Sequence, residues 1–90
     1  MEQKFLIQLE EDRQKAAALG VRIRPVEDMK QAKRLLSGSR TSDGFADLMK
    51  KGQLKLSLEA LVVDKRFTAL FTDDEANTAL MRLLDAGYGF

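Results

Sequence analysis

The side chains able to do chemistry in this chain are carboxylates and cations, because the 90-residue sequence contains no histidine and no cysteine. The general base most used near neutral pH, the thiolate nucleophile and the commonest metal ligands are therefore missing. The carboxylates include two consecutive runs, at residues 10–12 and 73–75. Consecutive side chains on a helix fan around its axis and do not converge on one point. We therefore predict that the protein is not an enzyme and holds neither a metal ion nor a cofactor.

Basic residues in the middle of the chain form the sharpest candidate binding site. They are Arg22, Arg24, Lys30, Lys33, Arg34 and Arg40. The spacing of the three at positions 30, 33 and 34 places them on one face of a predicted helix, where they could meet a phosphate backbone. Against this, Glu27 lies on the same face, no aromatic residue interleaves with the cations, and the net charge is only +1. A solvated helix face is the alternative.

Two aromatic residues at the carboxyl end, Tyr88 and Phe90, follow the last predicted helix. They either close the core or form an exposed anchor for a partner, since aromatic side chains are enriched at interface hot spots. Leu6 and Ile7 lie off the main apolar stripe of the first predicted helix and present the same two alternatives.

Charge is distributed unevenly along the chain. Residues 21–55 carry 9 basic and 4 acidic side chains, whereas residues 56–90 carry 3 and 6. Such an asymmetry either steers an anionic partner toward one face or holds the parts of the domain together.

Composition indicates one small folded domain in a reducing compartment. Apolar residues make up 44% and charged residues 32% of the chain, which is ordinary for a globular protein. The lack of cysteine excludes disulfides, which small secreted domains commonly need. No stretch approaches the ~20 apolar residues of a membrane span. We therefore expect a cytoplasmic protein without a membrane partner.

Glycine and proline predict the elements of the first half. Residues 2–19 are good helix formers, and Gly20 follows where a left-handed cap is expected. Residues 21–24 predict an extended connector. Pro25 suits the first turn of a second helix, so the sequence predicts that this helix begins there.

Capping residues predict the elements of the second half. Ser42 or Asp43 is expected to cap a third short helix. Residues 54–58 alternate between apolar and polar types and predict an extended approach to a fourth helix, which Ser57 can cap.

The strongest local signal in the chain starts the last helix. Thr72 and Glu75 have the spacing of a capping box, in which each side chain satisfies a free backbone N–H of the first turn. Gly87 is expected to end this helix. Its predicted buried stripe is Ala76, Ala79, Leu80, Leu83 and Leu84.

Short helices joined by short connections predict an all-α fold, a compact orthogonal bundle of about five short helices. We expect a single domain over residues 1–90. Its amino-terminal part, residues 1–41, holds two helices and a loop, and its carboxyl-terminal part, residues 42–90, holds the rest.

The second part carries a recognisable pattern of core, cap and turn residues. It comprises Ser42, Asp43, Gly44, Phe45, Leu48, Gly52, Leu54 to Val62, Phe67, Leu70, Phe71, Thr72, Glu75, Ala79, Arg82, Leu83, Gly87 and Tyr88. This pattern over residues 42–88 resembles a helical module of small uncharacterised bacterial proteins that have no settled function. The resemblance implies a helical fold and a bacterial or phage origin. It transfers no catalytic or binding residue.

These observations lead to a functional hypothesis. We expect a protein-binding module, an adaptor or inhibitor of a larger bacterial or phage complex, that contacts its partner through the first helix, the basic second helix or the aromatic tail. The alternative is a small nucleic-acid-binding domain that uses the basic second helix. Self-association into a homo-oligomer is a third hypothesis.

Overall fold

The computed structural model describes residues 1–88, and within that range the chain is all helical, with no strand. Five α-helices and two short 3₁₀ turns follow one another. They are α1 (Glu2–Ala18), α2 (Met29–Ser37), α3 (Phe45–Lys50), η1 (Leu54–Leu56), α4 (Leu58–Val62), η2 (Thr68–Leu70) and α5 (Asp73–Asp85). The predicted all-α fold of about five helices is confirmed.

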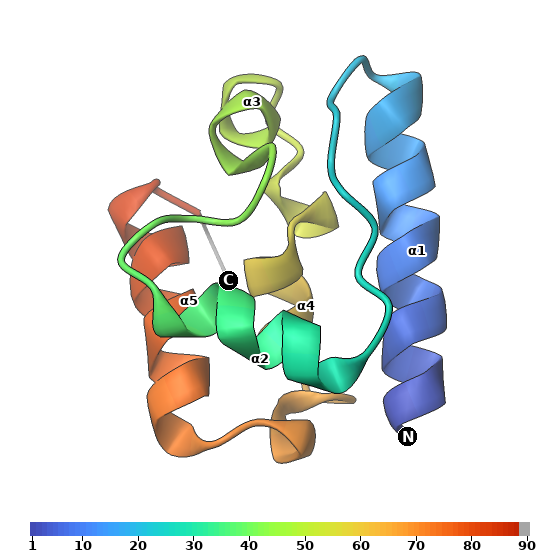
Figure 1. Cartoon of the computed structure of the whole chain (residues 1–90). Coiled ribbons are helices and arrows are strands. Elements are labelled where there is room, and N and C mark those ends of the chain that lie inside the picture. Colours follow the sequence, from blue (N-terminus) through green and yellow to red (C-terminus); the bar gives the residue numbers. More distant parts are fainter. Residues whose placement is uncertain (89–90) are drawn as a thin grey trace.

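The two longest helices lie on opposite sides of the molecule (Figure 1). In this view α1 runs along the right side and α5 along the left, and α2 and α4 lie between them. Helix α4 packs chiefly against α5 and η1, and α2 also packs against α5. Helix α3 sits at one end of the bundle (Figure 1). As a result α1 and α5 each keep a long outer surface.

Phe5 lies at the centre of the larger of two groups of buried side chains. Its ring is fully buried and stands edge-on to Phe67 and Phe71, with ring centroids 5.5 Å and 5.2 Å away. The whole group is Phe5, Leu9, Met29, Ala32, Leu36, Leu58, Leu61, Val62, Phe67, Phe71 and Ala79. Residues on both sides of position 41 therefore share one core.

A second buried group joins α3 and η1 to the later turns of α1 and α5. It consists of Ala16, Val21, Phe45, Leu48, Leu54, Leu56 and Leu83. Ile23 and Tyr88 are partly buried against it. Through this group the connector after α1 and the segment after α5 are both held to the bundle.

Several predicted helix ends are confirmed. Gly20 has a φ of 84°, a left-handed conformation that suits glycine, just after the end of α1. The Ser57 hydroxyl accepts a hydrogen bond from the backbone N–H of Ala60 at the start of α4. Thr72 and Glu75 form the predicted capping box at the start of α5.

The predicted start of the second helix at Pro25 is wrong, because α2 begins at Met29. Asp28 caps it by accepting a hydrogen bond of 2.8 Å from the backbone N–H of Gln31. The Gln31 side chain reaches back, accepting from the backbone N–H of Glu27 and donating to the carbonyl of Pro25. This reciprocal capping keeps residues 25–28 out of the helix.

The predicted cap of the third helix is also wrong. Helix α3 follows Gly44, which has a φ of 74°, and no side chain caps it. The side chains of Ser42 and Asp43 instead bind Glu59 and Arg24. A Cβ atom at Gly44 would lie 2.6 Å from Cγ1 of Val21, so glycine permits both the turn and a close approach of the connector.

Two further predictions fail because tertiary packing overrides the local pattern. Residues 54–56 form the 3₁₀ turn η1, which buries Leu54 and Leu56 together, and not an extended segment. Leu84, predicted to lie in the buried stripe of the last helix, is 50% exposed.

Candidate functional site

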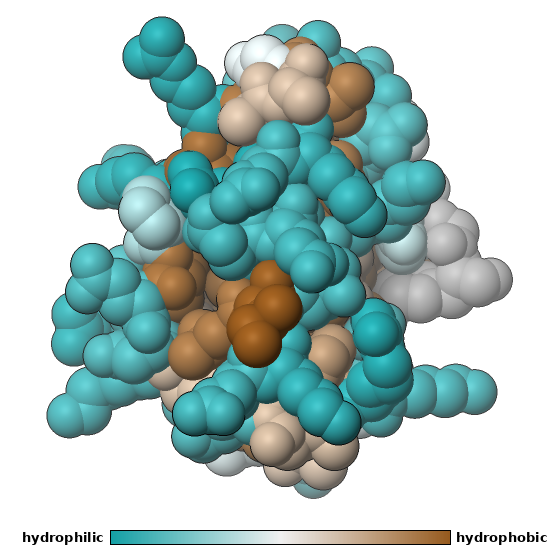
Figure 2. All heavy atoms as spheres, turned by 90° about the vertical axis from the view of Figure 1, so that its right-hand side faces the viewer, coloured by the Kyte–Doolittle hydropathy of each residue, from teal (hydrophilic) through white to brown (hydrophobic). Residues whose placement is uncertain are grey.

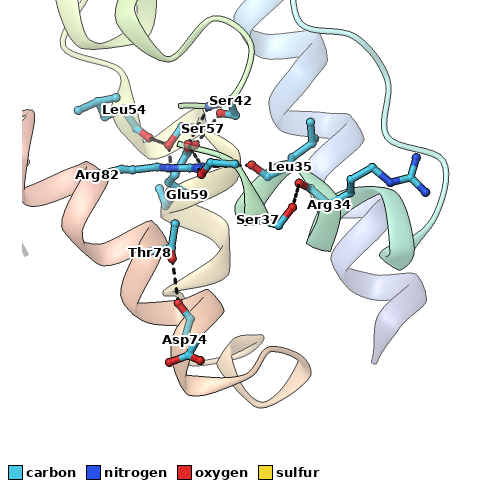
Figure 3. A network of polar contacts seen from close by, with 12 residues as sticks. Arg34, Leu35, Ser37, Ser42, Leu54, Ser57, Glu59, Asp74, Thr78 and Arg82 are labelled. Atoms are coloured by element: carbon cyan, nitrogen blue, oxygen red, sulfur yellow. Dashed lines mark hydrogen bonds and ion pairs between the residues drawn. The ribbon is translucent and has the colours of Figure 1, made fainter. Parts of the chain in front are cut away.

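A buried carboxylate, Glu59, lies at the junction of α4, α5 and the loop before α3 (Figure 3). Its side chain is 0% exposed and forms an ion pair with Arg82 of α5, Oε2 to Nη1 3.1 Å. The backbone N–H of Ser42 donates to Oε2 and the Ser42 hydroxyl donates to Oε1. Both carboxylate oxygens are therefore satisfied, as a buried charge requires.

Arg82 also fastens the end of α2 to α5. Its Nη1 donates to the carbonyl oxygen of Leu35 at 3.3 Å, and its Nη2 donates to that of Gly38 at 2.8 Å. Figure 3 shows Arg82 reaching across from α5 to these groups. Among the described residues no buried polar side-chain atom lacks a partner. The network is thus saturated, and its role is to hold three segments together.

Of the six predicted basic site residues, two are held by carboxylates of the protein itself. Arg24 forms a two-pronged ion pair with Asp43, at 2.9 Å and 3.3 Å, and the Arg24 hydrogen bond lowers the pKa of the Asp43 carboxyl. Lys33 pairs with Glu75 at 3.2 Å and lies 5.4 Å from the centre of the Phe71 ring. Burial raises the pKa of Glu75, but its hydrogen bonds with Thr72 and Lys33 leave that pKa below its usual value.

The other four predicted cations, Arg22, Lys30, Arg34 and Arg40, are exposed and have no ion pair within residues 1–88. They come from three segments: the connector, α2 and the loop that follows α2. In Figure 3 the Arg34 side chain points away from the buried network. Four of the six predicted cations are therefore free of ion pairs within residues 1–88, and their binding role stays a prediction.

The two predicted aromatic residues differ in what the structure describes. Tyr88 is partly buried against the second core group, and its backbone N–H donates to the carbonyl of Leu83 at 2.9 Å. This packing places Tyr88 at the edge of the core. Phe90 lies outside the described residues.

Three hollows differ in whether they can take a ligand. A small cavity of about 30 Å³ between α1, the connector and residues 42–43 has room for about one water molecule. A groove of about 550 Å³ runs between α1 and the segment from η1 to Arg66. A second groove, of about 490 Å³, lies between α5 and residues 38–39. Of these three hollows, the two grooves have the size of a binding site, as does a further hollow of about 370 Å³ between the start of α1 and residues 66–67.

The groove beside α1 has a buried carboxylate among its lining residues. Asp12 is 5% exposed, its side chain accepts a hydrogen bond of 3.0 Å from Gln8, and burial raises its pKa. The outer surface over α1 is mainly hydrophilic, with one hydrophobic area near the centre of the view and smaller ones elsewhere (Figure 2). Ile7, 60% exposed, is the most exposed large apolar residue within this helix.

The outer surface of α5 has a different composition. Met81 and Leu84, one turn apart, are 55% and 50% exposed. Asp73, Asp74 and Asp85 are exposed around them and have no ion pair in the part of the chain that the structure describes. The single basic residue of α5 is Arg82, which the buried network uses. This apolar and acidic surface was not predicted as a site from the sequence.

Comparison with models of known protein families, with curated proteins and with solved structures found no match. The resemblance of residues 42–88 to a bacterial helical module stays a prediction.

Two further observations bear on the kind of site. Within residues 1–88 no three acidic side chains are grouped so that they could hold a metal ion. None of the described helices has both the length and the apolar character needed to cross a membrane.

The sequence contains signals for the two features that were not predicted, the buried network and the outer surface of α5. Glu59 stands among Leu58, Leu61 and Val62, and Arg82 directly precedes the buried Leu83, so two opposite charges occur in apolar surroundings. Buried charges of this kind are normally paired. The signal for the outer surface is Asp85, a carboxylate in the last turn of a helix, where a cation is favoured.

Proposed function

We propose that the protein is a non-catalytic protein-binding module, an adaptor or inhibitor of a larger bacterial or phage complex, that works in the cytoplasm. The observation that carries this proposal is the outer surface of α5. Two large apolar side chains are about half exposed there beside three unpaired carboxylates. A partner protein that covered the two apolar side chains would gain hydrophobic burial without disturbing the fold.

The proposed bacterial or phage setting and the cytoplasmic location rest on the sequence. The setting rests on the resemblance of residues 42–88 to a bacterial helical module. The location rests on the absence of cysteine from the sequence.

An affinity capture from a lysate of the native host tests the proposal, run with and without nuclease and followed by mass spectrometry. We expect the same protein or protein complex to be retained in both arms. A matched bait with Leu84→Ser checks whether retention depends on the surface of α5. Retention of nothing above a blank resin would contradict the proposed function.

A nucleic-acid-binding function is the second candidate. The observation that favours it is the group of four exposed cations without an ion pair, at positions 22, 30, 34 and 40. Binding through several phosphates weakens by orders of magnitude between about 50 and 200 mM salt. Retention that collapses with nuclease, together with a steep salt dependence that Lys30→Ala and Arg34→Ala reduce, would favour this candidate over the first.

A further inference from the structure

The groove beside α5 is lined by two carboxylates without an ion pair among the described residues and by one cation that is already paired. Asp74 and Asp85 line it on α5, and Gly38 and Ser39 form its opposite wall. Arg82 also lines it, but this guanidinium is paired with Glu59 and donates to two carbonyl groups. The cation in the groove is therefore already neutralised, and the charged side chains of its lining that have no ion pair within residues 1–88 are both carboxylates.

The two carboxylates and an apolar side chain lie along one line of the helix. Asp74, Met81 and Asp85 are spaced by seven and four residues, which places them on one face of α5. Asp74 and Asp85 are eleven residues, or about three turns, apart, a distance of about 16 Å along the axis. Leu84 lies beside Met81 and widens the apolar area between the two carboxylates.

Two of these residues do not favour the stability of the domain on its own. Asp85 is the last residue of α5, where the partial negative charge of the helix end repels a carboxylate. Leu84 leaves half of its side chain in water. Neither residue type stabilises the fold at its position. Residues that depart from local preference in this way are expected at functional sites.

We propose that this surface binds an amphipathic helix of a partner protein, one whose apolar stripe is flanked by lysine or arginine residues. This inference rests on the proposed protein-binding function and names the partner's chemistry. Met81 and Leu84 receive the apolar stripe, since exposed methionine adapts its shape to different apolar partners. Asp74 and Asp85 pair with cations about three turns apart on the partner helix.

Charge complementarity favours a basic partner helix over nucleic acids, membrane surfaces or a second copy of the chain. Nucleic acids and anionic membrane surfaces are repelled by the three unpaired carboxylates of α5. A second copy of the chain offers its exposed cations Lys30 and Arg34 on α2, but that helix buries its own apolar residues Met29, Ala32 and Leu36 in the core. Helix α2 therefore lacks the exposed apolar stripe that the surface of α5 requires. The six-residue helix α3 has exposed Met49 beside Lys50 and Lys51, but its other large apolar residues, Phe45 and Leu48, are buried, so it has no stripe either.

The test is a titration of the ¹⁵N-labelled full chain, followed by NMR, with a synthetic helical peptide of about 18 residues, or five turns. The peptide has a leucine stripe flanked by lysines. A second peptide with the same leucine stripe and glutamates in place of the lysines is the control. We expect the lysine peptide to shift backbone signals of α5 and of residues 38–39, and the glutamate peptide to bind at least about tenfold more weakly.

Variants locate the binding surface. Leu84→Ser is expected to weaken binding of the lysine peptide by about fivefold or more. Ile7→Ser, which removes an apolar side chain of similar exposure from α1 on the opposite side of the molecule, is expected to leave it unchanged. The double variant Asp74→Lys/Asp85→Lys is expected to exchange the preference and bind the glutamate peptide better.

Several results would overturn the inference. They are no binding of the lysine peptide, equal binding of the two peptides, signal shifts away from α5, or equal losses from Leu84→Ser and Ile7→Ser. Dimerisation of the wild-type chain that Leu84→Ser abolishes, measured by light scattering, would make a second copy the occupant. A protein retained equally by wild-type and Leu84→Ser baits would contradict this inference and leave the proposed function standing.

Discussion

The inner and outer faces of α5 differ in burial and in ion pairing, although the residues concerned are neighbours in the sequence. Leu83 is 0% exposed and belongs to the second core group, whereas Leu84 is 50% exposed. Arg82 is held by a buried carboxylate and two carbonyl groups, whereas Asp85 has no ion pair within residues 1–88. On one face of the helix the side chains are buried or paired within the protein, and on the other face they are exposed and without an ion pair in the described part of the chain.

Because of this difference, the inner face should determine the stability of the fold and the outer face the affinity for a partner. Every polar group on the inner face has its partner inside the protein, so a change there alters the free energy of unfolding. The outer face contributes little to that free energy, so a change there should alter mainly the affinity for a partner. Variants on the two faces test this separation, and the largest expected effect is on the inner face.

Replacing Arg82 with methionine should produce the largest loss. It leaves Glu59, which is 0% exposed, without its cation, and it leaves the Leu35 and Gly38 carbonyls without a donor. We expect the free energy of unfolding to fall by about 3–5 kcal/mol, measured by urea denaturation. The double variant Glu59→Met/Arg82→Met removes both charges and should recover part of this loss. Equal losses in the single and double variants would show that the pair does not act as a unit.

Leu83→Ala and Leu84→Ala compare the two faces at adjacent positions. Removing the fully buried Leu83 side chain should cost about 2–5 kcal/mol, because it leaves a cavity in the second core group. Removing the half-exposed Leu84 side chain should change stability by less than about 0.5 kcal/mol. Thermal and urea unfolding measure both. Similar losses from the two variants would remove the distinction between the faces.

The charge of Glu75 should give a smaller, pH-dependent effect. The pKa of this carboxyl is lowered in the folded protein, so its charged form contributes stability above the pKa of the unfolded chain and loses it as pH falls through the folded value. Glu75→Gln keeps an oxygen for the capping box but loses the charge that faces Lys33. We expect a deficit below about 1 kcal/mol at pH 7 that disappears in acid. A deficit that is constant with pH would assign the effect to the cap alone.

Asp85→Lys should have the smallest effect on stability, and in the opposite direction. A cation in the last turn of α5 is favoured by the partial negative charge of the helix end. We expect the free energy of unfolding to rise by about 0.3–1 kcal/mol, measured by urea denaturation at low ionic strength. A loss of stability would mean that Asp85 has a structural role, and it would remove one argument for a partner on this face.

The sequence predicted those helix ends that are fixed by interactions between residues close together in the chain. The Thr72 and Glu75 capping box and the Gly20 cap involve residues within a few positions of each other, and both are present. The predicted start of α2 was wrong because Asp28, whose side chain accepts a hydrogen bond from the backbone N–H of Gln31, caps the helix, and this cap outweighs the preference of Pro25 for a first turn. The three-residue spacing of Asp28 and Gln31 is the signal in the sequence for this start.

Long-range contacts were beyond sequence reasoning. Glu59 and Arg82 are 23 positions apart, and nothing in either neighbourhood specifies the other as its partner. Likewise, the exposure of Leu84 depends on α2 and α4 packing against the opposite side of α5. For the candidate site, four predicted cations are exposed without an ion pair, whereas Arg24 and Lys33 pair with carboxylates that lie 19 and 42 positions away.

The most direct test of the separation between the two faces measures stability and binding on one variant, Leu84→Ser/Asp85→Lys, in one buffer. The free energy of unfolding comes from urea denaturation, and the dissociation constant is measured for the partner retained in the capture experiment. We predict a stability within about 0.5 kcal/mol of the wild type, or slightly above it, and a dissociation constant raised by about fivefold or more. A large loss of stability, or an unchanged dissociation constant, would contradict the account.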